Sequence, residues 1–262
     1  MAAGIAAITS QPCDVVSDNS RNRRAWDATS DDYQRRHGGQ LLVNVEAWGV
    51  WSYPESELQL LGDVADRDVL EYGCGGAQWS ISLAKRGARC TGLDNSQRQL
   101  DYARAAVTAA RADVRLVHAA AETPPFPDGS FDVVFCDHGA FSFTAPEQTI
   151  PQAARLLRSG GILAFSVAHP LREVCLDWKQ DCLSRALQRS YFELSVIDGP
   201  DGVVSHVRPI ATYLTILLEA GFTLEKLLEP RPPIDATSSY DFAPIEWARN
   251  FPAELMFRAR RR

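Results

Sequence analysis

The sequence lacks the features that mark several classes of protein. Only six of its 262 residues are cysteines, and none forms the C-x-x-C pair that is typical of zinc sites. No apolar run approaches the length of a transmembrane helix, and Met1–Ile5 lacks the basic residues and long apolar core of a signal peptide. We therefore expect reduced cysteines, no metal, no membrane contact and a cytoplasmic location.

Basic residues are also too few for a nucleic-acid-binding protein. Lys and Arg number 27 against 33 Asp and Glu, and the net charge is -6. A protein that follows a phosphate backbone usually carries a basic stripe. We expect a small-molecule partner rather than a nucleic acid. The oligomeric state stays open, and a homodimer is possible.

The pattern that is present alternates strands with helices. The length suits one α/β domain with additions, and the hydrophobic fraction of 45% is that of an ordinary globular protein. Alternating strands and helices demand a mainly parallel sheet with right-handed crossovers. The predicted strands are 69–72, 88–94, 114–118, 131–136, 162–167, 222–228 and 253–258, and the predicted helices between them are 79–86, 96–112, 147–157 and 209–220, with a turn at Ser159–Gly161.

A glycine-rich turn follows the first of these strands. Gly73, Gly75 and Gly76 lie between the strand and a helix, an arrangement that lets a ligand approach backbone N–H groups. The next strand ends in Asp94, about twenty residues further on, where nucleotide-binding α/β units place an acid for ribose hydroxyls. The third glycine of a dinucleotide fingerprint would fall at position 78, which is Gln78. The turn therefore does not indicate a pyrophosphate site.

The run from Leu70 to Gly76 resembles the first motif of class I S-adenosylmethionine-dependent methyltransferases. The stretches 122–134, 154–161 and 218–222 resemble the small-molecule type, which includes ubiquinone and sterol methylating enzymes. The resemblance covers residues 65 to 170 well and 209 to 260 loosely. It implies a Rossmann-like, doubly wound, seven-stranded and mostly parallel sheet with an antiparallel last strand. It also implies S-adenosylmethionine as cofactor and S-adenosylhomocysteine as product.

The resemblance assigns a set of cofactor-binding residues. It places the glycine turn at the methionine moiety, Asp94 at the ribose and Tyr33 over the methionine end. Relatives carry Asp-Ala-Glu at the adenine, whereas this chain has Ala120-Ala121-Glu122, so the side-chain contact from the Asp is missing. The full predicted set is Tyr33, Glu71, Gly73, Cys74, Gly75, Asp94, Asn95, Gln99, Ala121, Glu122 and Cys136.

Two histidines are candidate catalytic residues. His138 follows the fourth strand and His169 follows the fifth, at the sheet edge where α/β proteins bind ligands. A histidine suits a base that takes a proton from a phenol, alcohol or acidic carbon. The alternatives are that Asp137 caps a turn rather than orienting His138, and that His169 only fixes a loop.

Segments outside the core motifs are predicted to shape the substrate pocket. We expect a disordered tail at 1–20, a helical lid at 21–62 that is broken at Gly38–Gly39, and a methyltransferase domain at 63–262. The strand–helix rhythm stops at 171–208, which predicts a substrate-side insertion with a hairpin. Predicted pocket residues are His37, Trp48, Trp51 and His206, and the alternative for each is core packing or solvent exposure.

The sequence as a whole predicts methyl transfer to an O, N or C atom of a small organic molecule. Its richness in Ala and Arg is typical of GC-rich bacteria, which associates it with specialised metabolites. The alternative is a protein that binds S-adenosylmethionine without methylating: a regulator, a scaffold or a cyclisation catalyst.

Overall fold

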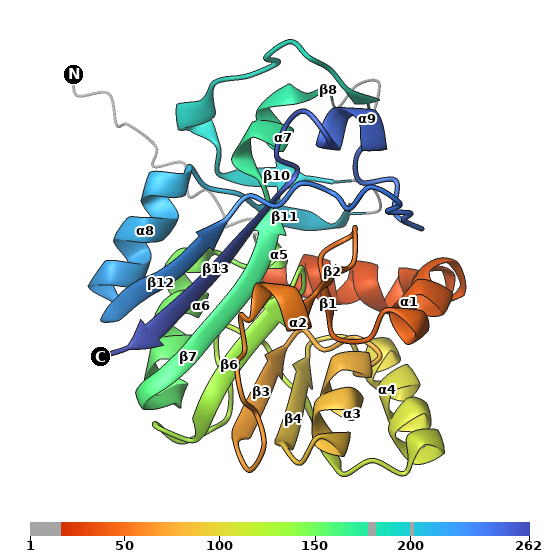
Figure 1. Ribbon diagram of the computed structural model, residues 1–262, viewed down its shortest axis with the longest axis vertical. Helices are drawn as coiled ribbons and strands as arrows, with labels where there is room; N and C mark the ends of the chain where they lie inside the picture. Colours follow the sequence, from red (N-terminus) through yellow and green to blue (C-terminus); the bar gives the residue numbers. More distant parts are fainter. Residues whose placement is uncertain (1–16, 178–181, 200–201) are drawn as a thin grey trace, which may run out of the picture.

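The computed structural model describes residues 17–177, 182–199 and 202–262, so most of the predicted disordered tail lies outside the described residues. Its centre is a seven-stranded sheet (Figure 1). In spatial order the strands are β12 (Phe222–Leu228), β13 (Glu254–Arg261), β7 (Leu157–Ala168), β6 (Phe131–Asp137), β3 (Asp68–Tyr72), β4 (Arg89–Asp94) and β5 (Val114–His118).

The strand directions confirm the predicted sheet. The pairs β3–β4, β3–β6, β4–β5 and β6–β7 are parallel, while β13 runs antiparallel between β7 and β12. The strand order reverses on either side of β3, because β4 follows on one side and β6 on the other. Connections diverge at such a switch point and leave a crevice at the carboxyl ends of the strands.

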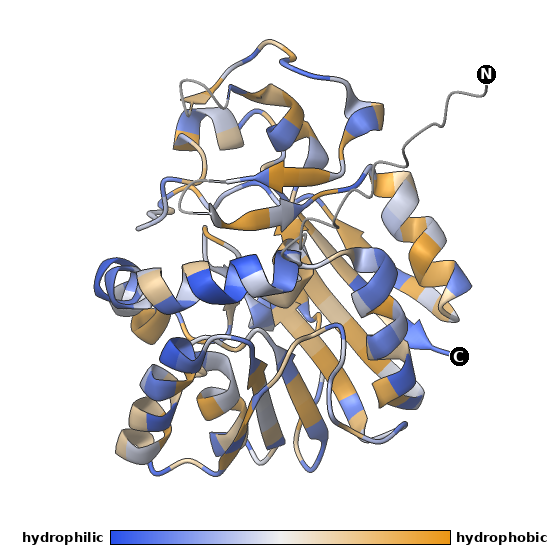
Figure 2. Ribbon diagram, turned by 180° about the vertical axis from the view of Figure 1, so that it is seen from behind, coloured by the Kyte–Doolittle hydropathy of each residue, from blue (hydrophilic) through white to orange (hydrophobic). Residues whose placement is uncertain are grey.

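The main helices pack on both faces of the sheet. They are α3 (Gln78–Lys85), α4 (Gln97–Ala110), α6 (Pro146–Leu156) and α8 (Ile210–Glu219). Leu70 and Tyr72 share an apolar cluster with α6 and α8, whereas Val69, on the opposite face, packs in the cluster that contains Leu83 of α3. The apolar strands between these layers are visible in Figure 2. Side chains that alternate along β3 therefore pack into two different apolar clusters, one on each face of the sheet.

Local sequence signals placed most element boundaries within a few residues. Ser96 caps α4 as predicted, accepting from the backbone N–H of Gln99 at 3.1 Å. The predicted turn at Ser159–Gly161 is instead an irregular stretch inside β7, where the register to β6 shifts between Phe131 and Val133. The strand therefore begins at Leu157, five residues before the predicted start.

The N-terminal helix α1 (Asp18–Val43) corrects two predictions. It begins inside the predicted disordered tail, capped by Ser17, and it continues through Gly38–Gly39 without a break. Each glycine costs a helix about 1 kcal/mol, but neighbouring residues anchor this end. His37 bonds the hydroxyl of Ser239 at 2.9 Å, and Gln40 donates to the carbonyl of Val50 at 3.0 Å.

The lid continues as a short hairpin. Strands β1 (Ala47–Trp48) and β2 (Tyr53–Pro54) pair antiparallel and lead into α2 (Glu55–Leu58). The buried carboxylate of Glu55 accepts hydrogen bonds from the indole N–H of Trp48 and from the backbone N–H groups of Leu60 and Leu61. This carboxylate ties the hairpin to the chain that enters β3.

The predicted insertion forms a cap above the carboxyl ends of the parallel strands (Figure 1). Its described elements are α7 (Pro170–Cys175), β8 (Leu176–Asp177), β9 (Cys182–Leu183), η1 (Tyr191–Glu193), β10 (Val196–Asp198) and β11 (Val204–His206). Strands β10 and β11 pair antiparallel, which confirms the predicted hairpin. Two further short helices, α5 (Ala140–Phe143) and α9 (Ile245–Ala248), complete the described structure. None of the helices described here has the length and apolarity needed to cross a bilayer.

Candidate functional site

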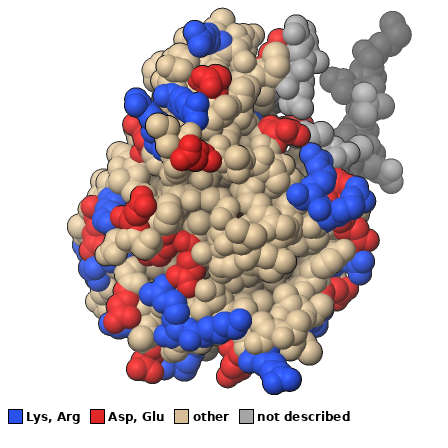
Figure 3. Space-filling model, turned by 45° about the vertical axis from the view of Figure 1, so that its right-hand side comes forward, with Lys and Arg blue, Asp and Glu red and all other residues tan. Residues whose placement is uncertain are grey.

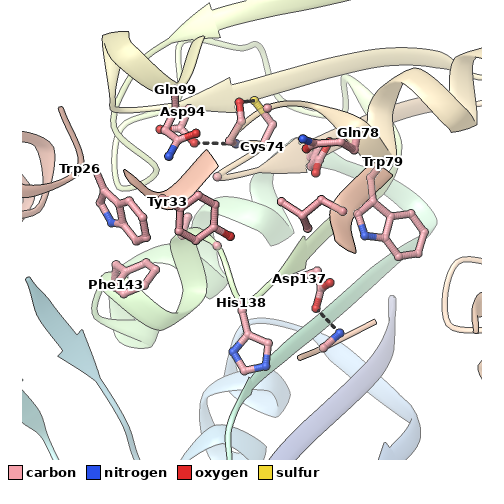
Figure 4. A pocket seen from close by; sticks show the side chains of 18 of the residues that line it. Trp26, Tyr33, Cys74, Gln78, Trp79, Asp94, Gln99, Asp137, His138 and Phe143 are labelled. Carbon is pink, nitrogen blue, oxygen red and sulfur yellow. Dashed lines mark hydrogen bonds between the residues drawn. The ribbon is translucent and has the colours of Figure 1, made fainter. Parts of the chain in front are cut away.

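A pocket lies at the carboxyl ends of β3, β4 and β6, beneath α1 (Figure 4). Its empty volume is about 1290 Å³, open solvent at the mouth included. Ten predicted site residues line it: Tyr33, Glu71, Gly73, Cys74, Gly75, Asp94, Asn95, Gln99, Ala121 and His138. The switch point of the sheet therefore brings predicted cofactor-binding residues and the candidate catalytic residue His138 to the same pocket.

The glycine turn after β3 packs directly on the turn after β6. Gly73 has φ +73°, and a Cβ there would lie 2.4 Å from the backbone nitrogen of Ala140. Only glycine permits both this backbone conformation and this approach.

The start of α3 leaves backbone donors available. Its N-cap is Ala77, whose methyl side chain cannot accept a hydrogen bond from the helix. Within the described chain, the N–H groups of Gly76, Gln78 and Trp79 have no hydrogen-bond partner. A helix N-terminus with free N–H groups suits a carboxylate or another anion.

Asp94 closes the turn from the neighbouring strand. One carboxylate oxygen accepts from the N–H of Gly75 at 2.9 Å and the other from the N–H of Ser96 at 2.8 Å. Burial raises the pKa of Asp94, and these backbone hydrogen bonds oppose the rise. The carboxylate is held at the tip of β4 and has lone pairs left for a ligand hydroxyl.

Glu71 is a buried carboxyl group at the floor of the pocket. One oxygen accepts from the backbone N–H of Ser80 at 3.1 Å and from its hydroxyl at 2.5 Å. Burial raises the pKa of Glu71 to about 8, and the charges of Asp137 and Asp94 add to the rise. A bound cation would favour the ionised form, so this end of the pocket suits a positively charged group.

Aromatic side chains form one wall of the pocket. Tyr33 bonds the hydroxyl of Tyr240 at 2.9 Å and meets Trp26 edge-on, with ring centroids 5.3 Å apart. Trp26 in turn contacts Phe143, and both lie beside Tyr33 in Figure 4. Sequence reasoning missed Trp26, Phe143 and Tyr240. Only Trp26 gave any signal, because its helical spacing from Tyr33 predicts a shared face.

Asp137 holds the lid rather than the histidine beside it. Its Oδ1 accepts from the N–H of Gly49 at 2.9 Å and from the hydroxyl of Ser166 at 2.5 Å. The hydroxyl oxygen of Ser166 accepts the backbone N–H of His138 at 3.0 Å. Asp137 thus neither orients the imidazole of His138 nor caps the following turn, which were the two roles predicted for it.

The partner of His138 is Glu254, which sequence reasoning missed. The distance from His138 Nε2 to Glu254 Oε1 is 2.7 Å, and Glu254 is fully buried at the start of β13. Burial by itself would lower the pKa of His138, but the hydrogen bond and the charge of Glu254 raise it above its usual value. In the sequence, Glu254 stands out only as a carboxylate that immediately precedes the apolar run Leu255–Phe257.

The other predicted histidines do not line the pocket. His169 caps α7 through Nδ1, which accepts from the N–H of Leu171, and its Nε2 bonds Glu229 at 2.7 Å. Its alternative role of fixing a loop therefore has direct geometric support. His37 stacks on Tyr240 with ring centroids 4.0 Å apart and also contacts the ring of Tyr33 at 4.8 Å, so it supports the aromatic wall from behind the lining. His206 is buried near Asp18, with 3.3 Å between Nε2 and Oδ2.

The remaining predicted residues also lie outside the pocket lining. Trp48 is fully buried and bonded to Glu55, and Trp51 is buried in the same apolar cluster, so both have the packing role that was their alternative. Cys136 is fully buried in β6, and Glu122 accepts a hydrogen bond from Asn19. Direct ligand contact by these residues stays a prediction.

The segment that contains the glycine turn is similar in sequence to known proteins. Residues 70–165 match a family described as a methyltransferase domain. A ubiquinone biosynthesis O-methyltransferase of Azoarcus sp. (strain BH72) is 34% identical over 105 residues, which is 39% of this chain and 45% of that protein. A demethylmenaquinone methyltransferase of Listeria monocytogenes serotype 4a (strain HCC23) is 39% identical over 101 residues, 37% of this chain and 43% of the relative. The chain thus spans less than half the length of these relatives.

Solved structures match over a larger part of the chain. A putative S-adenosylmethionine-dependent methyltransferase from Listeria monocytogenes has a TM-score of 0.64 at 25% identity, covering 79% of this chain and 97% of that one. The cyclase SpnF has a TM-score of 0.65 at 17% identity, covering 94% and 96% of the two chains, which shows a shared fold alone. Residues 70–165 therefore match a methyltransferase domain, and the chain shares the Rossmann-like fold of S-adenosylmethionine-dependent methyltransferases of known structure.

Proposed function

We propose that this protein transfers a methyl group from S-adenosylmethionine to a small organic molecule. One observation carries the proposal: a nucleotide-type cradle and a histidine suited to act as a base line the same pocket. The cradle consists of the glycine turn, the free N–H groups of α3 and Asp94. The histidine is His138, on the neighbouring strand end.

The residues present fit the parts of the cofactor. The free N–H groups at the start of α3 suit its carboxylate, and Glu71 suits its ammonium group. Asp94 suits the ribose hydroxyls, in agreement with the expectation from its position after β4. Asn95, Gln99 and Ala121 line the part of the pocket left for the adenine.

The chemistry asks little of the protein beyond positioning. S-adenosylmethionine supplies a methyl group already activated by its positive sulfur. The chain must hold the acceptor atom in line, about 3 Å from that methyl group, and keep water away. Side chains of α1 and residues of the β1–β2 hairpin line the pocket, which limits the access of water to it. His138 accepts a proton where the acceptor must lose one.

The acceptor is proposed to be a small molecule, with its O, N or C atom left open. The aromatic wall of Trp26, Tyr33 and Phe143 suits an apolar or aromatic compound. On the face shown in Figure 3, basic and acidic side chains are interspersed around a broad uncharged area, which supports a small partner rather than a phosphate backbone. Specialised metabolism and a cytoplasmic location remain parts of the proposal.

Thermal unfolding in the presence of added ligand tests the cofactor. S-adenosylmethionine and S-adenosylhomocysteine should each raise the melting temperature, because a ligand present at 100 times its Kd stabilises the folded state by about 2.7 kcal/mol. NAD is the matched control and should cause no shift. A shift with NAD alone would overturn the proposal.

Methyl transfer needs its own measurement. Incubation with S-adenosylmethionine and a panel of phenols, amines and acidic carbon compounds should yield S-adenosylhomocysteine with at least one class, detected by mass spectrometry. Binding without transfer to any class would favour the alternative of a non-methylating protein.

A further inference from the structure

Glu254 is a buried carboxylate whose contacts come from distant parts of the chain. Its side chain is 0% exposed, and Oε1 contacts both the backbone N–H of Val50 at 2.8 Å and Nε2 of His138 at 2.7 Å. Its Oε2 has no hydrogen-bond partner among the described residues. A buried carboxylate with an unsatisfied oxygen is expensive for the fold. Packing alone does not account for a carboxylate at this position.

Of the groups that surround His138 in the described structure, Glu254 is the one that bonds its imidazole ring. Asp137, the last residue of β6, also raises the pKa of His138 by its charge, but its Oδ1 bonds Gly49 and Ser166. Arg172 on α7 repels a protonated imidazole. Phe242 contributes only an edge-on ring contact at 5.5 Å.

The contact with Glu254 determines which nitrogen of His138 is available. A carboxylate can only accept, so the neutral imidazole carries its proton on Nε2 and has its lone pair on Nδ1. Nδ1 has no hydrogen-bond partner among the described residues, and the side chain is 21% exposed along the pocket. The backbone at His138 has φ +49°, a left-handed conformation that is uncommon for residues other than glycine, and the surrounding contacts hold it there.

The tip of the β1–β2 hairpin fixes Glu254 in turn. A Cβ at Gly49 would lie 2.2 Å from Glu254 Oε1, and Gly49 itself has φ +70°. The next residue, Val50, donates its N–H to the same oxygen. The lid and the carboxylate therefore fit together only with glycine at position 49.

We propose that Glu254 is a positioning residue for His138: it takes the Nε2–H bond, presents Nδ1 to the pocket as the proton acceptor, and is itself locked by Gly49 and Val50. The proton-transfer part rests on the proposed function, whereas the arrangement of His138 does not. In the reaction, the acceptor's proton moves to Nδ1 while its lone pair forms the bond to the methyl carbon. The carbon–sulfur bond breaks and leaves a neutral thioether, and Glu254 stabilises the imidazolium as it forms.

Nitrogen-15 NMR of the histidine side chains tests the arrangement in the wild-type protein. The signals of His138 are assigned by their loss in His138→Gln. The neutral ring should show its proton on Nε2. A neutral ring with its proton on Nδ1 would overturn the proposal without any substituted form of Glu254.

Glu254→Gln removes the charge and keeps the shape of the side chain. The pKa of His138 should fall by about 1, because a contacting carboxylate favours the protonated ring by at least that much. The neutral ring should also lose its preference for the proton on Nε2, since the amide can donate to that nitrogen. An unchanged titration and tautomer would show that Glu254 does not position His138.

Gly49→Ala tests the lock, and Gly129→Ala is its matched control. Gly129 has φ +62°, similar backbone strain, but no described atom lies within 4 Å of the place that a Cβ would take there. Gly49→Ala should shift the His138 titration in the direction of Glu254→Gln, whereas Gly129→Ala should leave it at the wild-type value. Equal behaviour of the two alanine variants would exclude the lock. Failure of the wild-type protein to bind S-adenosylmethionine would overturn the proposed function while leaving these NMR results decisive.

Discussion

The pocket has a proposed cofactor half, which holds Glu71 and Asp94, and a proposed acceptor half, which holds Asp137 and His138. These two halves are built in different ways. In the cofactor half, Glu71 bonds Ser80 nine residues away and Asp94 bonds Gly75 across 19 residues. In the acceptor half, Asp137 bonds Gly49 across 88 residues, and Glu254 reaches His138 and Val50 across 116 and 204. The first half belongs to one strand–turn–helix unit and its neighbour. The second exists only when the lid, the sheet centre and the last strand have assembled.

Substitution of Glu71 should give the largest effect, and it tests the cofactor half. Its pKa of about 8 in the folded state lies above the 4.5 of a free carboxyl group, so the folded state binds more protons between these values. The folding stability that the protonated group contributes is therefore complete below pH 4.5 and lost as the pH rises through 8. Glu71→Gln, which stays neutral, should unfold with a free energy larger than wild type by up to about 5 kcal/mol at pH 9, and by close to zero at pH 4.5.

Urea unfolding at the two pH values measures this difference. Glu57→Gln, at an exposed position on α2, is the matched control and should change stability little at either pH. The same difference for Glu71→Gln at both pH values would mean that the carboxylate is not buried as a charge. The cofactor half would then be more solvated than the structure shows.

Asp94→Ala should give the next largest effect. A hydrogen bond to a charged group contributes about 1.5–3 kcal/mol, so affinity for S-adenosylmethionine should fall by roughly 10- to 100-fold. Calorimetry measures the affinity, and Asp113→Ala, an exposed carboxylate next to β5, is the control. Unchanged affinity in Asp94→Ala would remove the ribose assignment. The His138 titration should stay at its wild-type value, because the acceptor half does not depend on Asp94.

The same contrast explains what the sequence could predict. The glycine turn, Asp94 and the Ser96 cap are local patterns, and residues close in sequence determine their geometry. The antiparallel β13 and the hairpin β10–β11 were also predicted. Glu254 and Tyr240 were missed because their roles depend on contacts across the assembled fold, and no spacing rule connects them to His138 or Tyr33. The prediction of a helix break at Gly38–Gly39 was wrong for the same reason, because tertiary contacts outweighed the low helix propensity of glycine.

His169 gives the smallest expected effect and tests the border of the acceptor half. Its Nδ1 caps α7, a role that asparagine can fill, so His169→Asn should lose only the bond to Glu229, at most about 1 kcal/mol. His169→Ala should lose a further ~1 kcal/mol with the cap. Both values come from urea unfolding at pH 8.

The pH dependence separates structure from catalysis at this residue. Burial lowers the pKa of His169 below its usual 6.5, although the hydrogen bond to Glu229 opposes this shift. The unfolded state therefore binds more protons than the folded state at a pH near and below 6.5. The wild-type protein loses folding stability as the pH falls through 6.5. Asparagine cannot be protonated, and the stability deficit of His169→Asn should therefore shrink between pH 8 and pH 5. Methyl transfer by His169→Asn should match wild type at pH 8. A loss of transfer in the folded variant would instead place His169 in the acceptor site and extend that half of the pocket to the end of β7.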